Sequence, residues 1–179
     1  MNPLERRSTF ALSSIFALRM LGLFMIIPVF AVVGQSYQYA TPALIGLAVG
    51  VYGLSQALLQ IPFSLWADRF SRKPLIVFGL LLFALGGAVA AMSETIYGVI
   101  IGRAIAGAGA VSAVVMALLA DVTREENRTK AMAVMGMSIG LSFVVAFSLG
   151  PWLTSLVGIS GLFWVTTIMG LLAILMLFM

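Results

Sequence analysis

The chain has 179 residues, of which 62% are hydrophobic and only 9% are charged. Soluble domains average about half apolar and about a quarter charged residues, so this composition excludes an ordinary soluble fold. The formal charge of +4 would suggest a nucleic-acid partner in a soluble protein. Here the basic residues lie mostly in short segments between apolar runs, and no nucleic-acid partner is expected.

Apolar runs of about 20 residues, long enough to cross a bilayer, recur along nearly the whole chain. They predict an all-α, multi-pass membrane protein with six transmembrane helices, and its surrounding partner is the lipid bilayer. The predicted spans are residues 9–33, 43–66, 74–92, 97–120, 131–157 and 161–179. The first span is too long for a signal peptide and has no small-residue cleavage pattern, so we expect it to be retained.

The basic residues predict how these spans are oriented. They precede the first span and lie between the second and third and between the fourth and fifth, whereas the alternate loops contain none. The basic residues outside the spans are Arg6, Arg7, Arg69, Arg72, Lys73, Arg124, Arg128 and Lys130. Because cytoplasmic loops carry an excess of Lys and Arg, the N-terminus is predicted to be cytoplasmic.

Glycines recur along the spans at spacings that are typical of close helix packing. They are Gly46 and Gly50, Gly136 and Gly140, and the run of Gly102, Gly107 and Gly109. Close backbone approach supplies much of the association energy between helices in lipid, so we expect these glycines to pack against neighbouring helices. A three-plus-three inverted repeat would suit six spans, although the two halves show no clear sequence similarity.

The stretch LWADRFSRKPLI at 65–76 places four charged residues between the second and third spans. They are Asp68, Arg69, Arg72 and Lys73. Such a turn can be a simple positive-inside anchor. The order of residues 64–73, S-x-W-A-D-R-F-S-R-K, nevertheless resembles motif A of the major facilitator superfamily, usually G-x-L-a-D-r-x-G-r-k, which lies between helices 2 and 3. Ser64, Trp66 and Ser71 depart from that pattern.

A second stretch, in the fourth span, resembles motif B of the same family. It begins at Arg103 and reads R-A-I-A-G-A-G-A, where the family has R-x-x-q-G-x-g-a, with Ala106 in place of the usual Gln and Gly107 retained. Residues 121–128, DVTREENR, look like the charged segment that follows helix 4 in the family. The Gly-Pro pair at 150–151 is only weakly similar to the end of the antiporter motif C. The resemblance covers nearly the whole chain and points to the N-terminal half of bacterial drug:proton antiporters.

The resemblance implies a cytoplasmic gate in which the motif A residues, here Asp68, Arg69, Arg72 and Lys73, hold two halves together. Asp68 could accept charge-assisted bonds from Arg72 or from a helix N-terminus. Asp121, at the end of the fourth span, is a second candidate partner of Arg72. A weak cluster suits alternating access because the two states must differ by only a few kcal/mol. Asp68→Asn is therefore expected to abolish transport while leaving membrane insertion intact.

Two arginines lie inside predicted spans, where a cation costs about 2.5 to 3.5 kcal/mol on insertion scales. Arg19 is about 15 Å along the first span from Thr9, too deep for easy snorkelling. Arg103 is nearer the outer end and could instead snorkel while bonding carbonyl groups. The resemblance implies that Arg103 and Gly107 belong to proton coupling, in which the arginine acts on a nearby carboxylate. No Asp or Glu lies within a predicted span, so that carboxylate is expected to be Asp68, Asp121 or a residue outside this chain.

Three polar residues recur every fourth position of the second span and share one helix face. They are Tyr52, Gln56 and Gln60. Buried amides in lipid need hydrogen-bond partners, so this stripe could either join helices or line a cavity. A cavity with apolar neighbours would suit an amphipathic or hydrophobic substrate.

The chain contains no Cys and no His, which excludes thiolate metal sites, HExxH metalloproteases and Ser-His hydrolases. We expect no enzyme, no metal and no cofactor. The resemblance implies proton-coupled export of small amphipathic molecules or drugs across the bacterial inner membrane, with the proton gradient as energy source. Members of the family normally have twelve spans, so an absent C-terminal half or a second copy is the expected partner. The alternative is a half-size protein that acts as a channel or a non-transporting assembly subunit.

Overall fold

The computed structural model describes residues 2–178, and these fold almost entirely into helices. The elements are α1 (Pro3–Val33), the short 3-10 helix η1 (Gly34–Ser36), α2 (Pro42–Arg69), α3 (Arg72–Ala91), α4 (Ile96–Ala108), α5 (Ser112–Val122) and α6 (Glu125–Leu177). The prediction of an all-α fold is confirmed. A membrane-spanning protein satisfies its backbone groups internally in this way because lipid offers them no hydrogen-bond partners.

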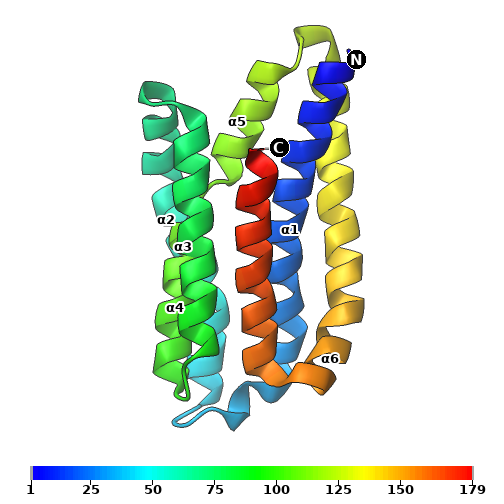
Figure 1. Ribbon diagram of the computed structural model, residues 1–179. Coiled ribbons are helices and arrows are strands. Elements are labelled where there is room, and N and C mark those ends of the chain that lie inside the picture. The colour runs from blue at the N-terminus through cyan, green and yellow to red at the C-terminus, as the bar shows by residue number, and fades with distance from the viewer. Residues whose placement is uncertain (1, 179) are drawn as a thin grey trace.

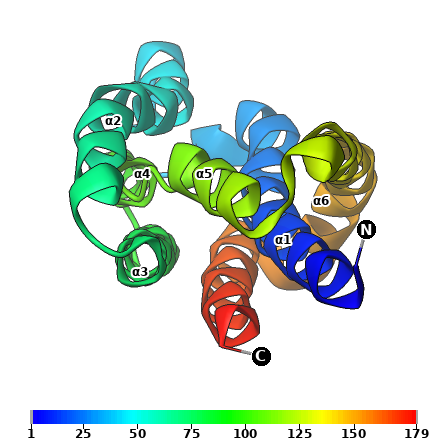
Figure 2. The same cartoon turned by 90° about the horizontal axis from the view of Figure 1, so that it is seen from above.

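The predicted number of six transmembrane helices is wrong by the criteria of length and apolarity. In the described residues, five helical segments are long and apolar enough to cross a membrane. The difference arises because predicted spans 131–157 and 161–179 both fall in α6, whose 53 residues run on without a loop. Gly158 has φ 71° and ψ 178°, a conformation that is essentially restricted to glycine. There α6 turns back on itself, and its two arms lie on either side of α1 (Figures 1 and 2).

The helices form two groups, with α5 between them (Figures 1 and 2). In one group α4 packs against both α2 and α3, and in the other α1 packs against α6; the groups meet directly where α3 packs against α6. Two apolar clusters each contain side chains of both groups; one includes Phe16, Leu80, Val115 and Met135, and the other includes Phe30, Ile96 and Phe163. The functional segments are therefore held by packing on several sides.

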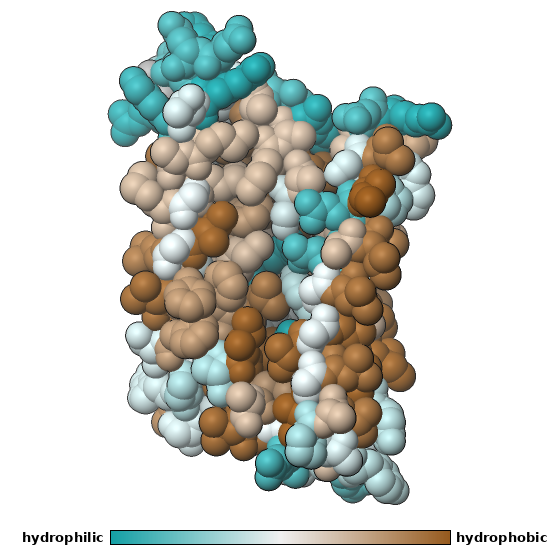
Figure 3. Space-filling model, turned by 180° about the vertical axis from the view of Figure 1, so that it is seen from behind, coloured by the Kyte–Doolittle hydropathy of each residue, from teal (hydrophilic) through white to brown (hydrophobic). Residues whose placement is uncertain are grey.

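The loops that carry the basic residues gather at one end of the bundle. The N-terminus, the α2–α3 turn and the α5–α6 turn lie together at the top of Figure 1. The opposite end contains η1 and the α3–α4 turn, where Thr41 and Thr95 cap the next helices by accepting bonds from Leu44 N (3.2 Å) and Gly98 N (3.3 Å). On the face shown in Figure 3, hydrophilic residues cluster mainly toward the ends and apolar residues cover much of the length between them.

The glycine spacing predicted packing correctly for only some positions. A Cβ added at Gly102 or Gly107 would meet the backbone of a neighbouring helix, so these glycines do permit close approach. Around Gly46, Gly50, Gly136 and Gly140 there is open space, so these four do not pack against a helix of the described chain. Their spacing is the same, but their helix faces point away from the rest of the chain.

Candidate functional site

The candidate gate lies at the basic end, where the α2–α3 turn meets the end of α5. Arg72 is the first residue of α3, and its Nη1 lies 2.5 Å from Oδ2 of Asp121 in the last turn of α5. The two side chains are 22% and 53% exposed. Exposed ion pairs of this kind contribute about 0 to 1 kcal/mol. The pairing that charge complementarity suggested is thus present, and it is weak enough to break and reform.

The other charged residues of the hairpin take no part in this ion pair. Asp68 and Arg69 end α2, and Lys73 follows Arg72 in the first turn of α3; all three are exposed. Asp68 forms no hydrogen bond or ion pair with any described residue, so neither partner suggested for it is engaged. The reason is local: Phe70 and Ser71 are extended, and the guanidinium of Arg72 is turned to Asp121 instead.

Arg103 is buried between α4 and α2 rather than extended towards the membrane surface. Only 3% of it is exposed, and its Nε donates to the carbonyl of Ala48 at 2.8 Å, while Nη2 donates to that of Val49 at 3.4 Å. The guanidinium also lies over the ring of Tyr52, 5.2 Å from the centroid. One turn along α4, Gly107 packs against the backbone of Tyr52, where a Cβ would overlap the carbonyl oxygen. Arg103 and Gly107 therefore hold the same segment of α2 close to α4.

Arg19 is the most deeply buried cation of the described chain, with 1% exposed. Its Nη1 donates to Oγ of Ser112 at 2.6 Å, and its Nη2 donates to the Gly109 carbonyl at 2.8 Å and to Oε1 of Gln56 at 3.2 Å. The ring of Phe83 lies 5.8 Å from the guanidinium carbon. Arg19 of α1 is thus hydrogen-bonded to α2, to the residue that follows α4 and to the first residue of α5.

That gap is a feature that the sequence did not predict, because the span at 97–120 was expected to be continuous. The helix ends at Ala108 and resumes at Ser112, and the residues between form tight turns in which Val111 N donates to Gly109 O at 2.8 Å. The available signal was the glycine run in this stretch, since glycine weakens a helix interior. Arg19 donates to the Gly109 carbonyl, an acceptor that a continuous helix would satisfy within itself.

The polar stripe of α2 mainly joins helices in this structure. Gln56 accepts from Arg19, and the ring of Tyr52 lies beneath Arg103, whereas the half-buried Gln60 side chain forms no hydrogen bond with the described residues. Tyr52 and Arg103 also line a cavity of about 10 Å³. This space is about the size of one water molecule, so it does not hold an amphipathic substrate in this conformation.

Glu5 is a buried acid at the basic end that the sequence reasoning missed. Its carboxylate accepts from Asn2 N at 2.7 Å, from Arg124 N at 3.0 Å and from Nδ2 of Asn127 at 3.3 Å. Arg124 is the residue that caps α6, so Glu5 joins the start of α1 to the N-terminus of α6, which favours an anion. The signal was the position of a glutamate in the first turn of a helix, which is typical of capping.

The model of the Major Facilitator Superfamily matches residues 12–179. The chain belongs to the major facilitator superfamily. Among curated proteins of the superfamily, the chain is 54% identical over 169 residues to the inner membrane transport protein YajR of Escherichia coli strain K12; the match covers 94% of this chain and 37% of YajR. It is 29% identical over 147 residues to multidrug resistance protein 1 of Bacillus subtilis strain 168, covering 81% of this chain and 37% of that protein.

Solved structures of the superfamily have the same helical arrangement. A bacterial homolog of the human lysosomal transporter Spinster, in an inward-facing and occupied conformation, superposes with a TM-score of 0.86 at 18% identity. The superposition covers 99% of this chain and 44% of that one. The chain therefore spans less than half the length of these superfamily members and has the fold of the part that it matches.

Proposed function

We propose that this chain is part of a secondary active transporter that exports small amphipathic molecules across a bacterial inner membrane by alternating access, driven by the proton gradient. Membership of the major facilitator superfamily and the absence of catalytic chemistry support transport. The similarity to YajR, which is named as an inner membrane transport protein, supports the location. The similarity to multidrug resistance protein 1 supports the substrate class. The basic loops gathered at one end support a cytoplasmic N-terminus.

The observation that carries the proposal is the ion pair between Arg72 and Asp121. It links the α2–α3 turn to the end of α5 at the basic end of the bundle, and it is partly exposed. A transporter that alternates between two conformations needs contacts that stabilise one state by only a few kcal/mol. We assign this pair to the state in which the cytoplasmic side is closed, together with the exposed residues Asp68, Arg69 and Lys73. Asp68 would then bond to a partner outside this chain.

The residue that carries the proton is proposed to be Asp68, Asp121 or a carboxylate outside this chain. In residues 2–178, neither Arg19 nor Arg103 is hydrogen-bonded to an acid; both bind carbonyl, amide or hydroxyl oxygens. Asp121 instead contacts an arginine at the proposed gate, and its side chain is half exposed to solvent. Arg103 supports transport by holding α2 against α4.

The test is transport by the full-length protein in inside-out bacterial membrane vesicles. Uptake of a fluorescent cationic dye should follow an imposed pH gradient and stop when a protonophore collapses it. Asp121→Asn and Asp68→Asn should abolish this uptake while the protein level in the membrane is unchanged. Glu125→Gln, which alters an exposed acid with no bonded partner in the described residues, is the matched control and should transport normally. Dye flux that persists without a proton gradient would contradict the antiporter and favour a channel.

A further inference from the structure

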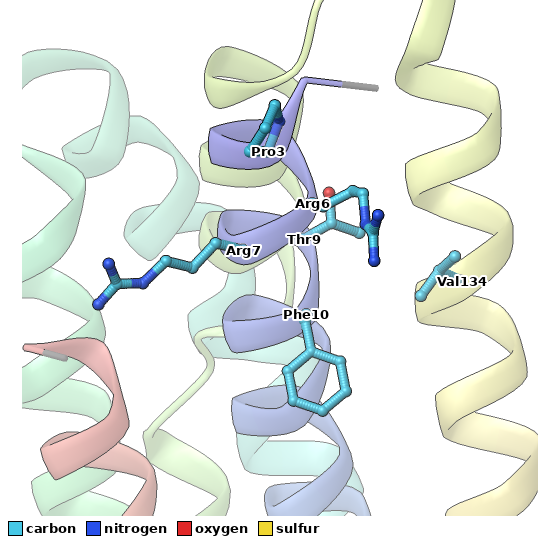
Figure 4. Close-up of a pocket in the computed structure, with 6 residues that line it drawn as sticks. All are labelled: Pro3, Arg6, Arg7, Thr9, Phe10 and Val134. Carbon is cyan, nitrogen blue, oxygen red and sulfur yellow. The ribbon is translucent and has the colours of Figure 1, made fainter.

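A crevice opens between the first turns of α1 and the first arm of α6, at the basic end of the bundle. Its volume is about 610 Å³, and it is lined by Pro3, Arg6, Arg7, Thr9, Phe10 and Val134. Figure 4 shows Arg6, Thr9 and Phe10 on the side of α1 that faces Val134, whereas Arg7 extends from the other side of that helix. The crevice is far larger than the cavity beside Tyr52, and none of the gate residues lines it.

Two cations beside this crevice have no partner within the described chain. Arg6 lines the crevice, and Lys130 lies one helical turn before Val134 on the same face of α6. Both are exposed, and neither side chain forms a hydrogen bond or ion pair with a described residue. Arg124 and Arg128 nearby differ, because Arg124 lies near Glu5 and Glu126 and Arg128 donates to the carbonyl of Ala120.

The crevice changes from cationic to apolar at the depth where the predicted spans begin. Arg6 and Lys130 lie just outside predicted spans 9–33 and 131–157, and the residues one turn further along each helix are Phe10 and Val134. Phe10 is 71% exposed despite its apolar ring. The stripe of Val134 continues along α6 through Met137 and Leu141, each 66% exposed. This order of cation and then apolar surface matches the order of headgroup and acyl chain in a lipid leaflet.

Thr9 adds a polar group that points to a ligand. Only 3% of Thr9 is exposed, and its Oγ1 has no hydrogen-bond partner in the structure although it lines the crevice. Figure 4 shows this hydroxyl oxygen beside Arg6. A buried hydroxyl without a partner costs free energy unless a ligand or water satisfies it, so a hydrogen-bond acceptor held next to Arg6 would satisfy both.

We propose that this crevice binds one anionic phospholipid of the membrane. Its phosphate lies between Arg6 and Lys130 and accepts a hydrogen bond from the hydroxyl of Thr9. One acyl chain covers Phe10 and Val134 and continues along Met137 and Leu141. Basic pockets between transmembrane helices are a general means of binding such headgroups. The proposal depends on the membrane location of the chain and not on its substrate or its coupling ion.

The experiment is native mass spectrometry of the purified full-length protein in neutral detergent, titrated with phosphatidylglycerol and, separately, with phosphatidylcholine. We expect one tight adduct of phosphatidylglycerol and weaker binding of the neutral lipid. Each cation near an anionic headgroup contributes about 1 kcal/mol, and a factor of ten is 1.4 kcal/mol. The double variant Arg6→Gln/Lys130→Gln should therefore bind phosphatidylglycerol about 30-fold more weakly. Thr9→Val, which keeps the shape, should also weaken binding.

The matched control removes two exposed cations from the same end of the molecule but outside the crevice, as Arg69→Gln/Lys73→Gln. An equal loss of phosphatidylglycerol in this control would overturn the site, because surface charge alone would then explain the binding. Unchanged binding in Arg6→Gln/Lys130→Gln would overturn it as well. Displacement of the lipid by millimolar inorganic phosphate would show a phosphate site without the apolar contact and would contradict the assignment to a lipid.

Discussion

The contact between Arg19 and Ser112 makes a sharp prediction about how the α4–α5 gap is stabilised. Ser112→Ala removes the acceptor that lies 2.6 Å from Nη1 of a guanidinium that is 1% exposed. Hydrogen bonds to charged groups contribute about 1.5 to 3 kcal/mol in soluble proteins, and interhelical bonds in membranes reach at most about 1.7 kcal/mol. We expect the free energy of unfolding to fall by about 1.5 kcal/mol, where the two ranges overlap.

The assay is a double-mutant cycle on the full-length protein, with unfolding measured in mixed detergent micelles. In an Arg19→Met background, Ser112→Ala should change the free energy of unfolding by less than about 0.5 kcal/mol, because the buried donor is already gone. Ser148→Ala is the matched control: its exposed hydroxyl bonds only to the Val144 carbonyl of its own helix, and its removal should be nearly neutral. An equal cost of Ser112→Ala in both backgrounds would refute the proposed dependence on Arg19.

Three further predictions concern the close helix contact, the turn of α6 and the gate. Gly107→Ala should destabilise the protein by about 1 to 3 kcal/mol in the same unfolding assay, because its Cβ meets the backbone of α2; Gly136→Ala, which has open space, should not. Gly158→Ala should cost about 1 to 3 kcal/mol because φ is 71° there, and a stability equal to the parent would show that the turn rearranges. Arg72→Asp and Asp121→Arg should each abolish dye transport while changing stability by less than about 1 kcal/mol, and the combined exchange should restore transport; failure of that rescue would argue against a direct pair.

The sequence predicts the helical elements well because the bilayer imposes simple requirements. A length of about 20 apolar residues and basic residues in alternate loops are local properties that can be read without knowing any contact. The same local rules located the turn at Gly158, between two predicted spans, but not the fact that the turn needs only this one non-helical residue. The interruption after Ala108 was missed because the bonds that satisfy it come from Arg19, about 90 positions away in the chain.

The candidate site was predictable to the extent that charge alone determined it. Opposite charges at neighbouring span ends made Asp68 and Asp121 candidate partners of Arg72, and the structure pairs Arg72 with Asp121. The partners of Arg19 and Arg103 could not be predicted from charge. They are carbonyl, amide and hydroxyl oxygens, which occur on every helix of the chain. Glycine spacing predicted packing only in part. It shows that glycines share one face of a helix, but not whether that face contacts another helix of the chain. Gly107 therefore packs against α2, whereas Gly136, with a similar neighbourhood in sequence, faces open space.

The two arginine contacts of α5 differ in strength, and this difference determines how the segment can move. α5 has 11 residues and is about 16 Å long. At its first residue, Ser112 is bonded to the fully buried Arg19, whereas near its last turn Asp121 is paired with the partly exposed Arg72. A buried charged bond costs more to break than a solvated ion pair. When the basic end opens, the contact at Asp121 should therefore break first, and α5 should pivot about Ser112 while the packing of α4 against α2 is retained.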